Sequence, residues 1–403
     1  MRPSIVISAV LAALVGFGST IALIIEAARA MGADADQTSS WVMALCLSMA
    51  VTSGYLSVRH RMPIITAWST PGAALIAGAG GTDIHAAVGA FLLAGGLVLL
   101  TAAFQPVGRL IERIPTSIAA AMLAGVLIRF AMGVFESAQG EPWLVLPLVA
   151  LFLLVRIASP SLAVVAVLAA GVAASFGLGL TAPLPDRLAL STLTFVAPTF
   201  DPAALIGLGL PLYLVTMASQ NLPGFAVLRA SGYVPPSRSI LAVTGLASVL
   251  TAPFGAHTSN LAAISAAICT GPDTHPDPAK RWMTGPFYAV CYLLLAVFGA
   301  LVLGVIAALP AALIKTIAGL ALMGALTGAL GSALSDETRR FPAVLAFVVT
   351  ASGLSLAGIG SAFWGLAAGL LAYGLEIAAR EVRERSARNG SLAPPLPAAG
   401  DKS

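Results

Sequence analysis

The chain has 403 residues, of which 58% are hydrophobic and only 9% are charged, and its mean hydropathy is +0.95. Such a composition excludes a soluble globular protein and is typical of a polytopic α-helical membrane protein. The net charge of +4 does not indicate nucleic-acid binding, because the cations form short clusters between apolar runs.

Apolar runs long enough to cross a bilayer, which takes about 20 residues, follow one another along the chain. We predict about fourteen transmembrane segments, of which the third and the tenth are short and broken by polar residues. The predicted spans are 4–27, 37–58, 63–80, 84–104, 115–135, 142–157, 160–180, 202–231, 238–253, 254–272, 282–305, 309–331, 341–358 and 361–380.

The first run resembles a secretory signal peptide, because Arg2 precedes it and Ala28-Arg29-Ala30 follows it. Its apolar stretch from Ile5 to Ile25 is longer than the core of a typical signal peptide. We therefore interpret it as a first span that the protein retains.

The cations set the predicted orientation. With both termini in the cytoplasm, seventeen of the 21 lysines and arginines fall in inside segments. Arg29, Arg129 and Arg187 fall outside, and Lys315 lies within a span. This is a positive-inside bias, and an even number of spans agrees with it.

Two segments of the chain look like copies of each other. Residues 67–77 align without gaps on 256–266, and Ile114-Pro115 is echoed by Leu309-Pro310. Corresponding broken segments in two halves indicate an inverted-repeat transporter. We predict a first repeat over 1–185, a second over 186–385, and a disordered cytoplasmic tail over 386–403, which is rich in Pro, Ala and Ser.

The tenth span carries the most unusual sequence, Leu250–Pro272, in which polar and helix-breaking residues precede an apolar helix predicted from Leu261 to Ile268. Irregular backbone at membrane depth is tolerated where it lines a cavity, and a helix that begins there directs N–H groups towards an anion. His257 is the histidine expected deepest in the membrane. Proton coupling, a neutral bridge between the broken helices and contact with substrate all remain open for it.

The eighth span is the second polar segment, since Ser219, Gln220 and Asn221 precede a Pro-Gly break. These residues line a cavity or bond neighbouring helices to one another. No acidic residue lies at the middle of a span, because Glu26 is nearer the outer end of the first. This pattern favours a monocarboxylate over a cation. Lys315 either extends to the membrane interface or attracts the anion.

An enzyme, a cofactor and a metal site are not expected. His257 and Ser259 lack an orienting acid nearby, and the His275–Asp277 pair is too sparse for a metal. The cysteines have no metal-binding spacing and are interpreted as packing residues. They are Cys46, Cys269 and Cys291.

Three segments resemble signature segments of the bacterial benzoate/proton symporter family, BenE. They are PIITAWSTPGAALIAG, ASQNLPGFAVLRASGY and PFGAHTSNLAAISAAICTGPDTHPDPAKRW. The family is related to the nucleobase–cation symporter and sulfate permease superfamily. The resemblance implies an all-α inner-membrane protein with a seven-plus-seven inverted repeat, a core domain and a gate domain. The substrate would lie between strand and half-helix pairs of the third and tenth spans, beside the eighth.

Carried over by position, the resemblance implies ten substrate-binding residues, with His257 also the candidate for proton coupling. They are Ser69, Thr70, Gly72, Gln220, Asn221, Gly255, His257, Thr258, Ser259 and Asn260. The nucleobase relatives place acidic residues on the eighth and tenth spans, where this chain has amides and hydroxyls. This departure favours an anion and leaves the proton carrier unnamed; the substrate carboxylate could bring the proton itself.

The expected function is therefore secondary active import of benzoate, or a similar aromatic carboxylate, with protons. The expected partners are this substrate, protons and membrane lipid, with a homodimer as a further option. The aromatic ring would pack on Phe17, Trp68 or Phe254. The alternatives are transport of another organic anion or a nucleobase, export, and a scaffold or sensor that transports nothing.

Overall fold

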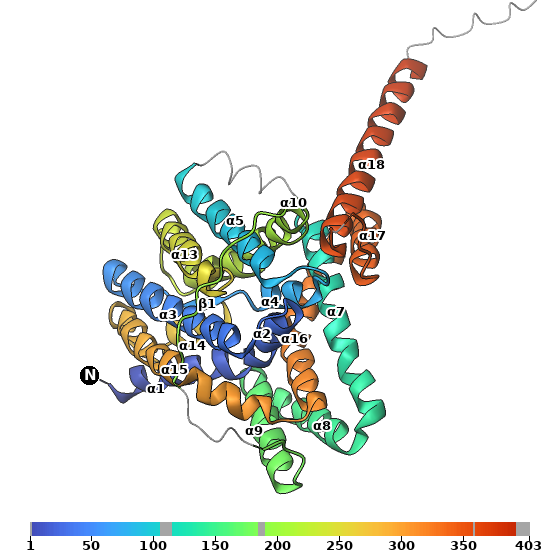
Figure 1. The fold of residues 1–403 in the computed structure, drawn as a ribbon. Coiled ribbons are helices and arrows are strands. Elements are labelled where there is room, and N and C mark those ends of the chain that lie inside the picture. The colour runs from blue at the N-terminus through green and yellow to red at the C-terminus, as the bar shows by residue number, and fades with distance from the viewer. Residues whose placement is uncertain (1, 105–114, 184–189, 358, 392–403) are drawn as a thin grey trace, which may run out of the picture.

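The computed structural model describes residues 2–104, 115–183, 190–357 and 359–391, which are mostly helical (Figure 1). Within these ranges nine helices are long and apolar enough to cross a membrane, and two shorter apolar helices span 142–158 and 162–177. Each of the predicted spans corresponds to a helix or to a strand followed by a helix. The number of fourteen crossings stays a prediction.

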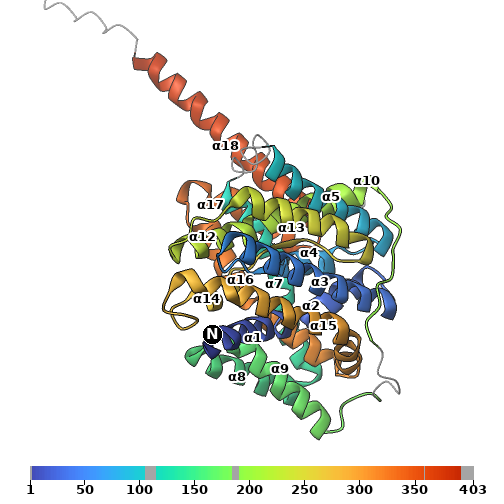
Figure 2. The same ribbon diagram turned by 90° about the vertical axis from the view of Figure 1, so that its left-hand side faces the viewer.

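The helices pack as two groups, and each group takes segments from both halves of the chain (Figures 1 and 2). The central group contains α1 (Pro3–Gly18), α2 (Ile21–Ala30), α3 (Ala35–His60), β1 (Thr66–Trp68), α4 (Thr70–Gly78), α5 (Ile84–Ala103), α10 (Pro202–Ala204), η1 (Leu205–Gly209), α11 (Leu210–Thr216), η2 (Met217–Asn221), α12 (Leu222–Ala230), α13 (Ser237–Thr251), η3 (Ala252–Phe254), β2 (Ser259–Leu261), α14 (Ile264–Thr270), η4 (Pro278–Met283) and α15 (Thr284–Ala307). The second group contains α7 (Thr116–Gly140), α8 (Pro142–Ala158), α9 (Pro160–Gly177), α16 (Ala311–Leu334), η5 (Glu337–Arg339), α17 (Arg340–Ala351) and α18 (Ser361–Ser391).

The ends of the chain differ from one another. Helices α1 and α2 pack against α14, α15 and α4, and retention of the first span stays a prediction. At the other end α18 continues through Ser391, so the first part of the segment predicted to be disordered is helical. Residues 392–403 lie outside the described ranges, as does Arg187, which was expected on the outer side.

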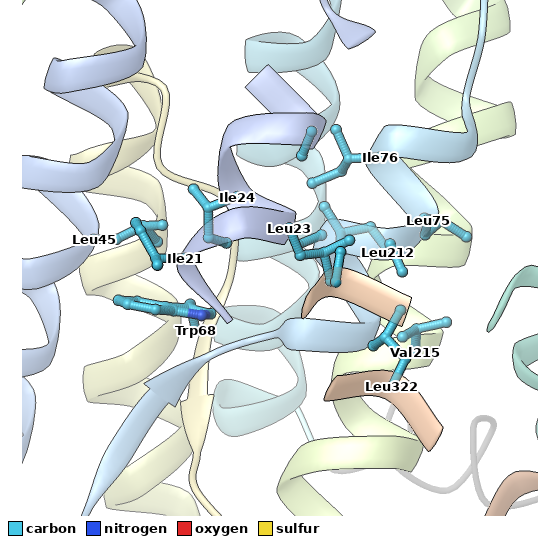
Figure 3. Packing of buried hydrophobic residues seen from close by; sticks show 14 of the residues in the cluster. Ile21, Leu23, Ile24, Leu45, Trp68, Leu75, Ile76, Leu212, Val215 and Leu322 are labelled. Atoms are coloured by element: carbon cyan, nitrogen blue, oxygen red, sulfur yellow. The ribbon is translucent and has the colours of Figure 1, made fainter. Parts of the chain in front are cut away.

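The centre of the first group holds the two broken segments. Strands β1 and β2 pair antiparallel, with Thr66 opposite Leu261 and Trp68 opposite Ser259. Figure 3 shows apolar side chains of α2, α3 and α4, including Ile21, Leu45 and Leu75, packed beside this part of the molecule. Because the strands are buried, their backbone groups must find partners within the protein.

The helix of the tenth segment begins later than predicted. Helix was expected from Leu261, but strand β2 extends through Leu261 and α14 begins at Ile264. The Leu261 N–H donates to Asn221 Oδ1 at 3.0 Å, and the Ala262 N–H donates to the Ile65 carbonyl at 2.9 Å. These bonds from other segments hold the backbone extended where apolarity alone favours helix.

The ungapped alignment of the two broken segments is also wrong in register. It pairs Trp68 with His257, whereas the last residue of β1, Trp68, corresponds to the last residue of β2, Leu261. Both segments are rich in alanine, so several registers match almost equally well. The match of Ile114-Pro115 with Leu309-Pro310 agrees better with the structure, because Pro115 and Pro310 directly precede the two long helices α7 and α16. The repeat itself stays a prediction.

Glycines allow α5 and α13 to approach closely. A Cβ at Gly95 would lie 2.9 Å from Ser248 Cβ and 3.1 Å from the Val249 N, whereas a Cβ at Gly96 would meet nothing within 4 Å. On α13, a Cβ at Gly245 would lie 2.7 Å from the Leu99 N. The α5–α13 distance therefore depends on residues without side chains.

We expect Gly95→Ala to destabilise the protein by about 1–3 kcal/mol, because overpacking pushes α13 away from α5. Gly96→Ala is the matched control on the same helix and is expected to stabilise it by up to about 1 kcal/mol. Thermal unfolding of the two variants in detergent measures the difference. Equal unfolding temperatures would contradict the close approach.

Candidate functional site

The short ribbon of β1 and β2 organises the predicted binding residues. It continues beyond the paired strands, since the Ser69 N–H donates to the Thr258 carbonyl at 3.2 Å. Ser69 is the N-cap of α4, and its Oγ accepts the Gly72 N–H at 3.0 Å. Because the strands are antiparallel, α4 and α14 begin at opposite ends of the ribbon.

His257 joins α3 to the start of α4. It is fully buried, its Nδ1 lies 3.2 Å from Trp41 Nε1, and its Nε2 lies 3.1 Å from the Ser69 carbonyl oxygen. An indole N–H can only donate and a carbonyl can only accept, so the ring is neutral and carries its proton on Nε2. In this conformation the geometry is that of the neutral bridge between the broken segments.

Asn221 connects the eighth segment to the ribbon. It ends the wide helical turn η2, and its Oδ1 accepts the Leu261 N–H while its Nδ2 lies 3.4 Å from Met217 Sδ. Gln220 is half-buried, and the half-buried Ser219 returns its hydroxyl to the Val215 carbonyl at 2.5 Å. The three polar residues of this span therefore differ: Asn221 is bonded to β2, Ser219 is bonded to its own helix, and Gln220 is half-buried.

The remaining polar residues of the predicted set, Thr258, Ser259 and Asn260, are buried, and the first two are bonded to other spans. Thr258 Oγ1 lies 2.6 Å from Thr216 Oγ1, and Ser259 Oγ lies 2.6 Å from Ser48 Oγ. Asn260 Nδ2 donates to the Leu261 carbonyl at 3.0 Å, while its buried Oδ1 has no hydrogen-bond partner among the described residues.

Both glycines on the predicted site are required by close approaches. Gly255 has φ of +90°, and a Cβ there would lie 3.1 Å from Trp41 Cβ. A Cβ at Gly72 would lie 2.7 Å from Leu212 Cδ1 and 2.7 Å from Ser69 Oγ. Gly255 thus allows α3 to approach the segment before β2, and Gly72 allows α11 to approach the start of α4.

Sequence reasoning missed a line of hydroxyls on α3 that supports the ribbon. Thr52 and Ser53 lie 2.6 and 2.7 Å from Thr66 Oγ1, and Ser57 donates to the Ile64 carbonyl at 3.0 Å. Together with Ser40 and Ser48 they are buried in the second span. Ser48 and Thr52, and likewise Ser53 and Ser57, are four residues apart, and this spacing is visible in the sequence because residues four apart share a helix face.

Arg281, at the end of the longest signature segment, was also missed as a structural residue. Its buried guanidinium donates to the carbonyls of Thr270 and His275, each at 2.7 Å. Thr270 is the last residue of α14, so a cation satisfies the carbonyl end of this half-helix.

Only two of the ten predicted residues, Thr70 and Gln220, are more than slightly exposed; the other eight are buried. Of the three aromatic residues expected near a ligand, Phe17 and Trp68 meet edge to face at 5.9 Å, whereas Phe254 packs against Phe195. Within the described ranges, no group of His, Cys, Asp and Glu could hold a metal ion. The ribbon thus offers neutral hydrogen-bonding groups and apolar surface.

Comparison with known proteins agrees with this fold. The family model BenE, described as benzoate membrane transport protein, matches residues 1–375. The inner membrane protein YdcO of Escherichia coli is 41% identical over 92% of this chain and 95% of its own. The benzoate membrane transport protein of Acinetobacter baylyi is 35% identical over 92% of this chain and 94% of its own.

A solved structure shares the fold at low sequence identity. The transmembrane domain of a cyanobacterial bicarbonate transporter, BicA, superposes with a TM-score of 0.59 at 15% identity, covering 87% of this chain and 97% of that one. At this identity the likeness concerns the arrangement of the helices alone.

The buried Thr216–Thr258 hydroxyl pair allows a double-mutant test of how the eighth segment is joined to the tenth. Thr216→Val or Thr258→Val alone leaves one buried hydroxyl unpaired, which costs about 1–3 kcal/mol. The double substitution removes both partners at nearly constant shape and is expected to cost less than the two single changes together. Thermal unfolding of the four proteins gives the coupling, and strictly additive effects would contradict the contact.

Proposed function

The chain belongs to the benzoate membrane transport family, BenE, and from this premise we propose that it imports benzoate, or a similar aromatic carboxylate, together with protons. The protein is a multi-pass membrane protein of a transporter family and not an enzyme. The substrate proposal rests on one observation: the ribbon is buried and has only neutral hydrogen-bonding groups. None of the ten predicted residues carries a fixed negative charge.

The proposed place for the substrate carboxylate is the N-terminal end of α4. There Pro71 has no N–H and the Gly72 N–H is already bonded to Ser69, so the Thr70 N–H and hydroxyl remain available. The Gln220 amide is the other half-buried donor of the predicted set. These neutral donors and the positive end of the helix dipole suit a monoanion, whereas a fixed carboxylate would repel it.

The other eight residues of the predicted set are buried, and we propose that they position the start of α4 and the ribbon rather than contact the carboxylate. Ser69, His257 and Thr258 form hydrogen bonds around the start of α4, and Asn221 fixes β2. Phe17 and Trp68 are the aromatic residues proposed to meet the ring, since Phe254 packs elsewhere.

Transport would follow from movement of the central helix group, as core domain, against the second group, as gate domain. We propose that the halves 1–185 and 186–385 form a seven-plus-seven inverted repeat. In transporters built this way, the substrate site commonly lies between the two repeats. The bacterial inner membrane, with both termini in the cytoplasm, is the proposed location, supported by the cation bias.

Gln220→Ala tests the place of the carboxylate. Loss of a hydrogen bond to a charged group lowers affinity by about 10-fold or more, so uptake of radiolabelled benzoate into proteoliposomes should fall by that factor at low substrate concentration. Ser219→Ala is the matched control, because its hydroxyl already bonds its own helix. Unchanged uptake in Gln220→Ala would contradict the site, and no uptake by the wild type would contradict benzoate as substrate.

His257→Gln tests proton coupling. Both ring nitrogens are engaged, so a role as proton carrier requires the Trp41 indole to leave Nδ1. We expect the variant to lower benzoate uptake by the same factor with and without an inward proton gradient, as loss of a positioning residue does. If the gradient no longer accelerates uptake in the variant, His257 is the proton carrier instead. Trp41→Phe, which frees Nδ1, is the companion variant.

A further inference from the structure

A cleft of about 630 Å³ opens between the two helix groups at the C-terminal end of α4. One wall comes from α2 and α4, and the other from α7, α16 and the end of α17. Its volume falls in the range of pockets that take small organic ligands, about 300–1,000 Å³. The cleft meets α4 from Leu75 onward, so at 1.5 Å for each residue about 8 Å of helix separates it from the start of α4 at the ribbon.

Two cations of the second helix group line this cleft. Arg129 lies on α7 and Lys315 on the second turn of α16, and both side chains are exposed there. Neither belongs to any of the ion pairs among the described residues, which join residues of 277–280 and 336–340. Ionisable residues within membrane spans are costly to retain, and such a residue is a functional candidate.

The cleft also contains two carboxylates and apolar surface. Glu26 belongs to α2 on the opposite wall, and Glu136 lies two turns beyond Arg129 on α7. Neither forms an ion pair with the cations in the described chain. Leu75, Phe130 and Ile314 supply apolar lining. The cleft is therefore lined by two cations of the second group together with carboxylates and apolar side chains.

The Arg129 guanidinium lies beside the backbone that follows the end of α17. A Cβ at Gly353 would lie 2.9 Å from Arg129 Nη1, and Gly353 has φ of +70°. A guanidinium beside the carbonyl end of a helix is stabilised by the helix dipole. There is no room for a side chain at this glycine without moving the guanidinium.

We propose that Arg129 and Lys315 form an outer binding site for the carboxylate of the transported anion, separate from the ribbon, with Leu75, Phe130 and Ile314 beside the aromatic ring. The inference rests on the proposed function. The cleft lies at the beginning of α16, and the Arg339–Arg340 cations follow the other end of this helix. By the positive-inside rule the cleft faces the cell exterior, where an imported substrate arrives.

The test is the concentration dependence of benzoate uptake into intact cells by Arg129→Gln, Lys315→Gln and the double variant. We expect each single variant to raise KM about 10-fold with little change in maximal rate, because a charge-assisted hydrogen bond is lost. Glu136→Gln is the matched control in the same cleft and should not raise KM. In the wild type KM should rise with ionic strength, and the double variant should lose this dependence.

Gly353→Ala provides a second variant that keeps every charge. It should raise KM by displacing the Arg129 guanidinium, and thermal unfolding of the purified protein verifies that it folds. An unchanged KM in both Gln variants, or a fall in maximal rate at constant KM, would overturn the outer site while benzoate uptake by the wild type upholds the proposed function.

If the wild type takes up no benzoate, the proposed function fails separately. The outer site is then tested by the shift in unfolding temperature that benzoate and a panel of other carboxylates produce. Loss of the shift in the double variant would support the site, and an equal shift, or none in either protein, would overturn it.

Discussion

The fold depends on how two interrupted segments satisfy their backbone within a membrane. An interrupted helix leaves N–H and C=O groups without partners, and the hydrocarbon offers none. Strands β1 and β2 pair over Thr66–Trp68 and Ser259–Leu261, and one further backbone bond at each end extends the pairing, so it covers only part of these groups. Side chains from distant spans complete it: Ser248 Oγ accepts the Ser259 N–H at 2.8 Å, and Asn221 accepts the Leu261 N–H.

This requirement explains why the central helices are rich in small and hydroxylated residues. The hydroxyls of α3 reach the ribbon from one side, and Ser248 reaches it from α13. Ser248 can do so only because Gly95 allows α13 to lie against α5. A polar ribbon in an apolar protein is stable when every member is bonded, and costly when one is not. Asn260 Oδ1, which has no partner in the part of the chain that the structure describes, is the exception on the ribbon itself.

The sequence predicts the position of the ribbon well and its internal register poorly. Polar residues such as Gln220 and His257 stand out in a chain that is otherwise apolar, so the breaks and the spans around them can be located. The start of α14 could not be predicted, because a side chain forty residues away, Asn221, decides that Leu261 is strand. The Ala-rich alignment failed for a related reason, since small apolar residues match in many registers. The bond from Trp41 to His257 likewise joins segments far apart in the chain, and no local pattern indicates it.

Charge is distributed differently along the proposed path of the substrate, and this has a mechanistic consequence. At the cleft, Arg129 and Lys315 are fixed cations on the second helix group, whereas the ribbon of the central group holds only neutral donors. Charged donors attract an anion over a longer range, but strong binding slows its release. Neutral donors and a helix dipole bind more weakly and require close contact. A carboxylate that first meets the cations and then moves to the ribbon would thus pass from the helix group that attracts it to the group that binds it through close contact.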